Sequence, residues 1–315
     1  MLKYLFFWLI FRVLGLLPVR VLYLIADFAG TLGYALFPSV RANVLDNLSH
    51  VMPNAVAGRQ RRRAARRIFR NVGRYYADLA HLPKMDAQQF FDRRLRVFGL
   101  REHLLPAVES GRGVIMLSGH FGNPELAVQG LIPCGVRVFA VTEPLQPAAL
   151  SAMLDGIRAS KGHAFAPVSV GSAKRVIKTL KSGGVVALMG DRDIQGPKQR
   201  LPFFGAETWM PTGPMEVALR TGAVVIPSFS MRRGSKLEAH MHPPLEFDHT
   251  GDFQQDVRAG TLAYVRLLEG YLSKEPEQWA VLEKLWDAAG EEAGAKREVR
   301  KAMSADTARL QGDDD

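Results

Sequence analysis

The sequence predicts an α/β protein in which helices cover a mixed, mostly parallel sheet, with an apolar and basic helical region in front of it. Two patterns predict this class. From Gly113 onward, short apolar runs alternate with segments of helical periodicity. Before that, an apolar segment is followed by an arginine-rich one. The 315 residues, 47% of them hydrophobic, suffice for a substantial core. The single cysteine, Cys134, excludes an internal disulfide and fits a reducing, cytosol-facing location.

The first expected element is the apolar segment from Tyr4 to Phe37, which carries three charges and is divided by Pro18. No uncharged run reaches the ~18 residues of a clean spanning helix. A short span that tolerates a charge, two helices lying in the interface, and a buried core helix all fit this pattern. A signal peptide fits less well, because the apolar stretch continues past Pro18 without a small-residue cleavage site. We interpret residues 1–40 as an apolar membrane anchor.

The second element is a basic helix predicted over residues 57–80. Residues 1–100 contain 16 Lys and Arg and 5 Asp and Glu, whereas the other 215 residues contain 25 and 26. Arginines recur at three-to-four-residue spacing along one side of this helix: Arg59, Arg63, Arg66, Arg67, Arg70 and Arg74. Each basic residue near an acidic lipid surface contributes about 1 kcal/mol. Nucleic acid is the competing partner, but zinc-finger spacing and aromatic RNA-binding strings are absent from the sequence. We expect membrane lipids and no nucleic acid.

The remaining elements belong to the sheet domain, which we expect to cover residues 41–289 and to include the basic helix. Apolar runs predict four buried strands: Val114–Leu117, Val136–Val141, Val185–Met189 and Val224–Phe229. Helical periodicity covers residues 147–160, 172–182 and 214–221. Two more helices are expected between residues 255 and 289, with a break near Pro276. Residues 290–315 are polar and are expected to form a loose tail.

The loop after the first strand carries the residues with catalytic chemistry, in the sequence "SGHFGNPELA". Asn123 is a good N-cap and Pro124 a good first helical residue. Glu125 then lies in the first helical turn and His120 on the loop, close enough to meet. A histidine held by a carboxylate could remove a hydroxyl proton for attack on an acyl carbonyl. From the residues alone, a structural histidine and a glutamate placed by the helix dipole fit equally well. Ser118 lacks a nucleophile elbow and is interpreted as strand.

An ordered series of motifs resembles the bacterial lipid A late acyltransferases, the lauroyl and myristoyl transferases. Their superfamily includes the phosphatidylinositol mannoside acyltransferases of actinobacteria. The resemblance covers roughly residues 20–290 and rests on His-x4-Glu in "SGHFGNPELA", "RANVLDNLSHVMP", "LKSGGVVALMGDRD", "LPFFG" and "MPTGPMEVALRTGAVVIP". Glu143 in "VTEPL", the run "GDRD" and "QWAVLEKLW" resemble the mannoside branch. Pro124 stands where both branches commonly have Trp, and Glu125 where the mannoside branch often has Asp. The acceptor therefore stays open between a lipid A precursor and a phosphatidylinositol mannoside.

The resemblance implies a fold like that of the glycerolipid acyltransferases, and roles for particular residues. It makes His120 the general base and Glu125 the residue that orients it. The acceptor hydroxyl then attacks the thioester of acyl-CoA or acyl carrier protein without a covalent acyl-enzyme. It also implies substrate-binding or oxyanion-stabilising roles for Arg158, Glu143, Asp191, Arg192 and Asp193. From the residues alone, surface helix charges or a solvated turn would explain these five. No metal and no cofactor beyond the acyl thioester are implied.

The expected location is the cytoplasmic face of the inner membrane, where the protein would act as a monomer. A membrane glycolipid cannot leave the bilayer cheaply, because each buried methylene is worth ~0.8 kcal/mol. The enzyme must therefore come to the surface, while the soluble thioester arrives from the cytosol. The alternative function is a non-catalytic membrane-binding protein that retains the acyltransferase fold.

Overall fold

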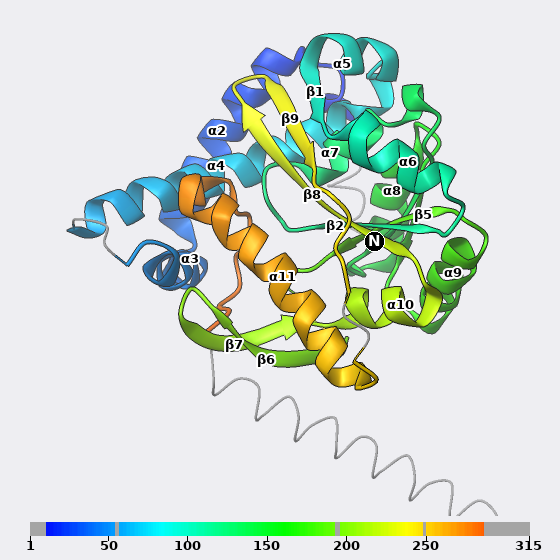
Figure 1. Cartoon of the computed structure of the whole chain (residues 1–315). Helices are drawn as coiled ribbons and strands as arrows, with labels where there is room; N and C mark the ends of the chain where they lie inside the picture. The colour runs from blue at the N-terminus through cyan, green and yellow to red at the C-terminus, as the bar shows by residue number, and fades with distance from the viewer. Residues whose placement is uncertain (1–10, 54–56, 193–195, 248–249, 287–315) are drawn as a thin grey trace, which may run out of the picture.

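The computed structural model describes residues 11–53, 57–192, 196–247 and 250–286, and a seven-stranded sheet lies at its centre (Figure 1). The strand order is β1-β9-β8-β2-β5-β3-β4. The strands are β1 (Leu95–Phe98), β2 (Val114–Ser118), β3 (Val138–Thr142), β4 (Ala164–Pro167), β5 (Val185–Met189), β8 (Val224–Arg233) and β9 (Lys236–Met241). Neighbouring strands are parallel except for the β8–β9 hairpin, which is antiparallel. The predicted mixed, mostly parallel sheet is confirmed, and the four expected strands are β2, β3, β5 and β8.

Helices cover both faces of this sheet, because successive strand residues point to opposite sides. In β2, Ile115 and Leu117 belong to one hydrophobic core with α9 (Val170–Lys181), α10 (Gly213–Thr221) and α11 (Phe253–Lys274). Met116 belongs to the other core, which includes α5 (Ala87–Arg94), α6 (Leu105–Glu109), α7 (Pro124–Gln129) and α8 (Ala148–Ala159). The helices predicted over 147–160, 172–182 and 214–221 are α8, α9 and α10. The sheet therefore separates two cores, and the loop after β2 lies where they meet.

The chain after α11 differs from the expectation of a second helix. A single 3-10 turn, η4 (Pro276–Gln278), follows α11, and residues 279–286 form no helix. The reason is that backbone N–H groups of this segment bond elsewhere. The N–H of Ala280 donates to the carbonyl of His120 at 2.7 Å, and that of Leu285 to the Asn47 side chain at 3.0 Å. We call residues 279–286 the C-terminal strap. The expected tail over 290–315 lies outside the described residues.

The strap packs on a separate two-stranded sheet, β6 (Lys198–Phe203) and β7 (Ala206–Pro211). Two consecutive residues in the left-handed region, Phe204 (φ 52°) and Gly205 (φ 76°), form the tight turn of this hairpin. The ring of Phe203 contacts Trp279 and stacks on Trp286 of the strap, with centroids 6.0 and 5.2 Å apart. In Figure 1 this hairpin lies below α11, on the same side of the sheet.

The N-terminal region includes three long helices, α2 (Val19–Leu36), α3 (Pro38–Val51) and α4 (Ala57–His81), and residues 11–14 are also helical. Pro18, which divides the apolar segment, is the N-cap of α2. Helices α2 and α4 approach closely where both carry glycine. A Cβ on Gly30 would lie 2.5 Å from the Phe69 carbonyl oxygen, and one on Gly73 would lie 2.5 Å from that of Ala26. One flank of α2 is therefore fixed against α4.

The close crossing of α2 and α4 generates a prediction. Replacing Gly73 with Ala places a methyl group against backbone and should lower the free energy of unfolding by about 1–3 kcal/mol. Gly156→Ala in α8 is the matched control, because a Cβ there meets nothing within 4 Å. That change should stabilise by up to ~1 kcal/mol. Denaturant unfolding measures both, and a Gly73→Ala variant as stable as the control would contradict the packing described here.

Candidate functional site

The site is centred on His120, in the loop that joins β2 to α7. Strands β2 and β5 are parallel neighbours, and Ser118 lies opposite Met189 in their register. His120 and Asp191 each follow these partners by two residues, so the two side chains meet at the carboxyl edge of the sheet. His120 Nδ1 lies 2.8 Å from Asp191 Oδ1, and the backbone N–H of His120 donates to Oδ2 at 2.7 Å.

Asp191 is fully buried, and the strap provides another of its donors. The indole Nε1 of Trp279 donates to Asp191 Oδ2 at 3.0 Å. Because a carboxylate only accepts hydrogen bonds, we assign the imidazole proton to Nδ1, which leaves Nε2 as the atom able to take a proton. Three donors thus hold the carboxylate, and it in turn fixes the ring orientation.

The charge of Asp191 sets the acid–base behaviour of the pair. Burial lowers the pKa of His120, but the adjacent Asp191 carboxylate more than compensates, so the pKa lies above the ordinary 6.5. Burial raises the pKa of Asp191, while the charge and hydrogen bonds of His120 lower it below its ordinary value. Both shifts favour an imidazolium–carboxylate pair once His120 has accepted a proton.

Glu125, the carboxylate expected beside His120, has a different partner. It does lie in the first turn of α7, where Asn123 caps the helix by accepting the Leu126 N–H at 3.0 Å. Its carboxylate, however, accepts from Arg158 Nε at 2.7 Å. The expectation that Glu125 orients His120 is corrected, because α7 directs Glu125 toward α8 and the carboxylate bonded to the imidazole is that of Asp191.

Arg158 is the centre of a buried polar network between α4, α7 and α8. The Arg158 residue is only 8% exposed. Besides Glu125, it donates to Asp155 at 2.8 Å and to the Tyr75 hydroxyl oxygen at 3.1 Å, and Asp155 also accepts from Thr142. Burial lowers the pKa of Arg158, but Glu125 and then Tyr75 raise it well above its ordinary value. The guanidinium is thus permanently charged and holds Glu125 in place.

His120 opens into a cleft of about 420 Å3, which we call the reaction cleft. Glu143, after β3, and Arg192, after Asp191, also line it, and these two side chains form an ion pair. Arg192 forms a second ion pair with Glu283 of the strap. The sequence-predicted residues Glu143, Asp191 and Arg192 therefore gather around His120. Asp193 lies outside the described residues.

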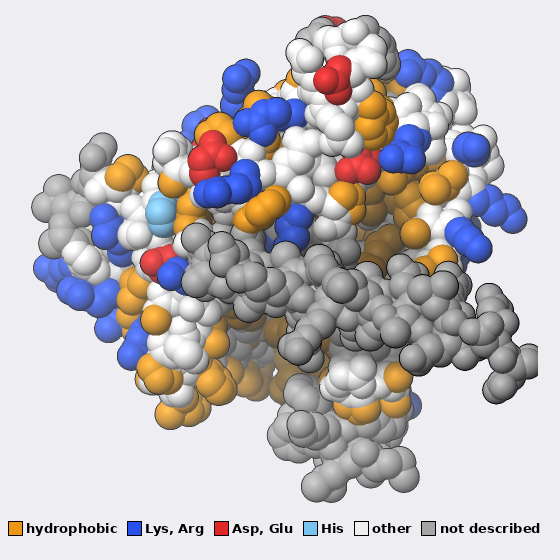
Figure 2. Space-filling view, turned by 90° about the horizontal axis from the view of Figure 1, so that it is seen from below, with side chains coloured by type: hydrophobic (Ala, Val, Ile, Leu, Met, Phe, Trp, Pro, Cys, Tyr) orange, Lys and Arg blue, Asp and Glu red, His pale blue; other side chains and the backbone are white. Residues whose placement is uncertain are grey.

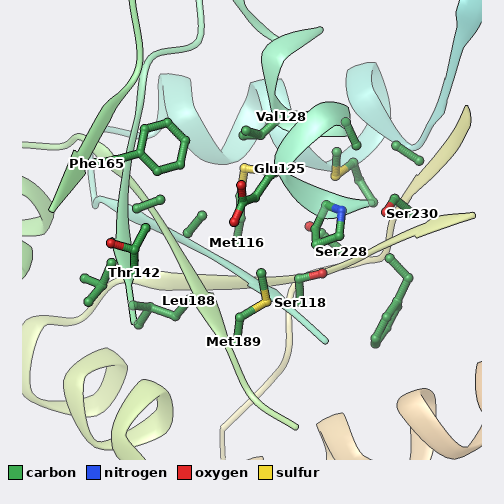
Figure 3. A pocket seen from close by; sticks show the side chains of 18 residues that line it. Met116, Ser118, Glu125, Val128, Thr142, Phe165, Leu188, Met189, Ser228 and Ser230 are labelled. Carbon is green, nitrogen blue, oxygen red and sulfur yellow. The ribbon is translucent and has the colours of Figure 1, made fainter. Parts of the chain in front are cut away.

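A second hollow, the apolar pocket, shares a wall with the reaction cleft. The two have Val141, Thr142, Leu188 and Met189 in common. The apolar pocket is narrow, about 70 Å3, and Figure 3 shows its lining of mainly hydrophobic side chains. These include Met116, Val128, Phe165, Leu188 and Met189. Glu125 also reaches this pocket and is its one charged lining residue among the described residues. His120 thus lines the reaction cleft, and Glu125 lines the adjoining apolar pocket.

Three residues that contribute to the site are not predicted from the sequence, because their signals there are weak: Trp279, Tyr75 and Asp155. His120 and Asp191 each follow the last residue of their strand by two positions. This equal spacing predicts that the two side chains meet, but only once β2 and β5 are known to be neighbours. Over the described ranges, no group of three or more His, Cys, Asp and Glu side chains is arranged to hold a metal ion. At the reaction cleft, His120 can transfer a proton and Arg192 can stabilise negative charge.

Comparison with known proteins identifies the family of this chain. A model of the family "bacterial lipid A biosynthesis acyltransferase" matches residues 1–288. A phosphatidylinositol mannoside acyltransferase of Mycobacterium tuberculosis (strain CDC 1551 / Oshkosh) is 29% identical over 219 residues, covering 69% of this chain and 68% of the relative. The phosphatidylinositol mannoside acyltransferase of Mycolicibacterium smegmatis is 27% identical over 221 residues, covering 69% and 70%. The chain therefore belongs to the bacterial lipid A biosynthesis acyltransferase family and is an acyltransferase.

Proposed function

We propose that this acyltransferase moves a fatty acyl group from acyl-CoA or acyl carrier protein to a hydroxyl of a membrane glycolipid. The observation that carries the proposal is the His120–Asp191 pair, open to the reaction cleft and adjoining an apolar pocket. The relatives are named for a phosphatidylinositol mannoside and the family for lipid A. Both names support a glycolipid acceptor, and the relatives favour one of the phosphatidylinositol mannoside type.

In the proposed mechanism His120 acts first as base and then as acid. Nε2 takes the proton of the acceptor hydroxyl while that oxygen attacks the thioester carbonyl. Asp191 stabilises the imidazolium that forms. Collapse of the tetrahedral intermediate breaks the carbon–sulfur bond and releases the carrier thiolate, which receives the proton from the imidazolium. An ester and a free carrier thiol result, without a covalent acyl-enzyme.

The two hollows suit different parts of the two substrates, the acyl chain and the polar groups. The apolar lining and narrow shape of the apolar pocket suit part of an unbranched acyl chain better than a sugar, whereas the wider reaction cleft suits polar groups. Glu143, whose side chain is 46% exposed, can accept hydrogen bonds from sugar hydroxyls at the cleft. Arg192 can neutralise a phosphate of the carrier or acceptor there. We assign Glu125 and Arg158 a positioning role, since their ion pair fixes α7, which carries the His120 loop, against α8.

Membrane association follows in this proposal from the flank of α2 that α4 leaves uncovered. Leu24 and Phe28 are each 71% exposed, and Leu32 and Leu36 continue the same apolar flank. Figure 2 shows hydrophobic side chains beside Lys and Arg side chains at the left edge of the molecule, where α3 and the start of α4 lie. Helix α2 is long and apolar enough to cross a membrane, although one such helix is weak support for a span.

We propose that α2 lies in the interface at the cytoplasmic face of the inner membrane. Its Asp27 is held by Arg74 at 2.7 Å and also by Arg70, both on α4. A spanning α2 would therefore draw charged groups of α4 into hydrocarbon, at a cost of about 2.5–3.5 kcal/mol each. An interfacial helix instead buries its apolar flank while the arginines stay at headgroup level.

Asp191→Asn and Glu125→Gln distinguish the two carboxylates in this mechanism. Asp191→Asn removes the charge that raises the His120 pKa. It should therefore lower kcat/KM by about 10²–10⁴-fold and move the acid limb of the pH–rate profile to lower pH. Glu125→Gln should destabilise the fold by about 1–3 kcal/mol, because Arg158 loses a charged hydrogen-bond partner, but should leave the acid limb in place. His120→Ala should abolish transfer in a protein that still folds, with a lower melting temperature because the buried Asp191 carboxylate loses the donor at Nδ1.

Transfer is measured with radiolabelled acyl-CoA or acyl carrier protein and a membrane lipid extract, between about pH 5 and 9. The wild-type rate should rise with pH to a plateau, with an apparent pKa above 6.5. An acid limb that moves in Glu125→Gln and not in Asp191→Asn would show that Glu125 is the orienting carboxylate. Normal transfer by His120→Ala would remove the proposed base.

The α2 flank is tested by the double change Leu24→Gln with Phe28→Gln. Losing two exposed apolar side chains should reduce sedimentation with anionic vesicles about tenfold or more, since each is worth about 1.5–3 kcal/mol when buried. Phe98→Gln with Val170→Gln is the matched control, because these side chains are also exposed but lie outside α2. Equal losses in both double variants would refute a membrane contact through α2.

A further inference from the structure

A third hollow lies between α4, the turn of the β8–β9 hairpin and the end of α11. We call this cleft of about 490 Å3 the arginine cleft. Five arginines line it: Arg67, Arg70, Arg74, Arg232 and Arg233. It shares no lining residue with the reaction cleft or with the apolar pocket. The arginine cleft is therefore a site separate from the two hollows assigned to acyl transfer.

The charges of the arginine cleft favour an anion. Against the five guanidinium groups stand two carboxylates in its lining, Glu275 and Glu277. Three further carboxylates that bind these arginines do not line the cleft: Asp27, Asp78 and Glu238, with side chains 16%, 4% and 23% exposed. Asp27 binds Arg70 and Arg74, Asp78 binds Arg232, and Glu238 binds Arg233. The five carboxylates together balance the five guanidinium groups, but the lining that a ligand would meet holds five guanidinium groups against two carboxylates.

The more exposed arginines retain hydrogen-bonding capacity. Arg67 donates through one amino group, Nη1, to Glu277, and Arg70 through one, Nη2, to Asp27, in the part of the chain described. A guanidinium has five N–H donors. The side chains of Arg67 and Arg233 are 48% and 41% exposed, so both can turn toward a ligand. Planar forks of this kind bind the oxygens of a phosphate in pairs.

The position of the arginine cleft identifies the source of the phosphate. Arg70 and Arg74 contact Asp27 of α2, and Arg232 donates to the Tyr23 hydroxyl on the same helix at 2.9 Å. The other flank of α2 is the exposed apolar one. A phospholipid has both matching parts, an acyl tail for the apolar flank and a phosphate for the guanidinium groups. We propose that the arginine cleft binds the phosphate of an anionic phospholipid headgroup.

A ligand bound in the arginine cleft would lie next to the segment that supports the catalytic loop. Gln278 lines the cleft, and its carbonyl accepts the Gly122 N–H at 2.9 Å, two residues after His120. The next residue, Trp279, holds Asp191. A headgroup in this cleft therefore sits against the segment that supports the catalytic pair without blocking the reaction cleft. It would seat the enzyme on the lipid surface through a site that is separate from the reaction cleft.

The test measures binding of glycerophosphoglycerol, the phosphatidylglycerol headgroup without acyl chains, to the purified full chain by calorimetry. Arg67→Gln with Arg233→Gln should weaken binding about tenfold or more, since hydrogen bonds to charged groups are lost. Arg62→Gln with Arg63→Gln is the matched control. It removes the same charge from exposed positions of α4 outside the cleft and should leave binding unchanged.

Glu277→Gln is a variant for which we expect tighter binding, an effect that misfolding could not produce. It frees Arg67 and removes a negative charge from the lining, so glycerophosphoglycerol should bind about threefold more tightly, the size expected of an exposed ion pair. Weaker or unchanged binding in Glu277→Gln would contradict the proposal. So would equal losses in the cleft and control double variants.

Vesicles distinguish a lipid headgroup from free phosphate. Sedimentation with vesicles of phosphatidylglycerol in phosphatidylcholine should fall more in the Arg67→Gln, Arg233→Gln variant than in the equally charged control. Inorganic phosphate at a few millimolar should not abolish it. If instead inorganic phosphate binds as well as glycerophosphoglycerol and the two double variants sediment alike, the cleft is a free-phosphate site and the phospholipid proposal fails.

Discussion

The buried carboxylate of Asp191 joins parts of the chain that lie far apart in sequence. It accepts hydrogen bonds from the ring and backbone of His120 and from the indole of Trp279. Placing a charge where Asp191 is fully buried is costly unless donors surround it. The loop after β2, the end of β5 and the C-terminal strap must therefore come together in one arrangement for this group to be tolerated. The reactive geometry of His120 is thus a requirement of the fold as well as of the chemistry.

The same strap connects the catalytic loop to the N-terminal helices. Ala280 bonds the His120 carbonyl, and the Asn47 side chain of α3 bonds both the Glu283 carbonyl and the Leu285 N–H. Trp286 stacks on His50 of α3 at 4.2 Å between ring centroids. Helix α4 meets η4 through Asn71, which donates to the Glu277 carbonyl. On the proposed account, the helices that contact the lipid surface and the loop that performs catalysis therefore form one packed unit. This coupling would hold the reaction cleft at a fixed height above the membrane.

Local patterns were enough to predict the buried strands, the helices between them and the capped start of α7. They missed β1, β4 and β9 of the central sheet and the β6–β7 hairpin, because these strands are half-buried or mix buried and exposed residues. The pairing of His120 was assigned to Glu125, five residues away on the next helix. The partner observed is Asp191, which depends on β5 lying beside β2 although β3 and β4 intervene in sequence. Strand order is a non-local property, so motif spacing alone could not supply it. The second helix expected after Pro276 failed for a related reason, since tertiary partners took the backbone N–H groups of the strap.

The central claim is that Asp191 holds His120 with its Nε2 free to accept a proton. A ¹⁵N NMR titration of the His120 imidazole in the folded protein, assigned with His120→Gln, tests it most directly. The account predicts a neutral ring protonated on Nδ1 and a pKa above 6.5. A neutral ring protonated on Nε2, or a pKa at or below that of a free histidine, would contradict it.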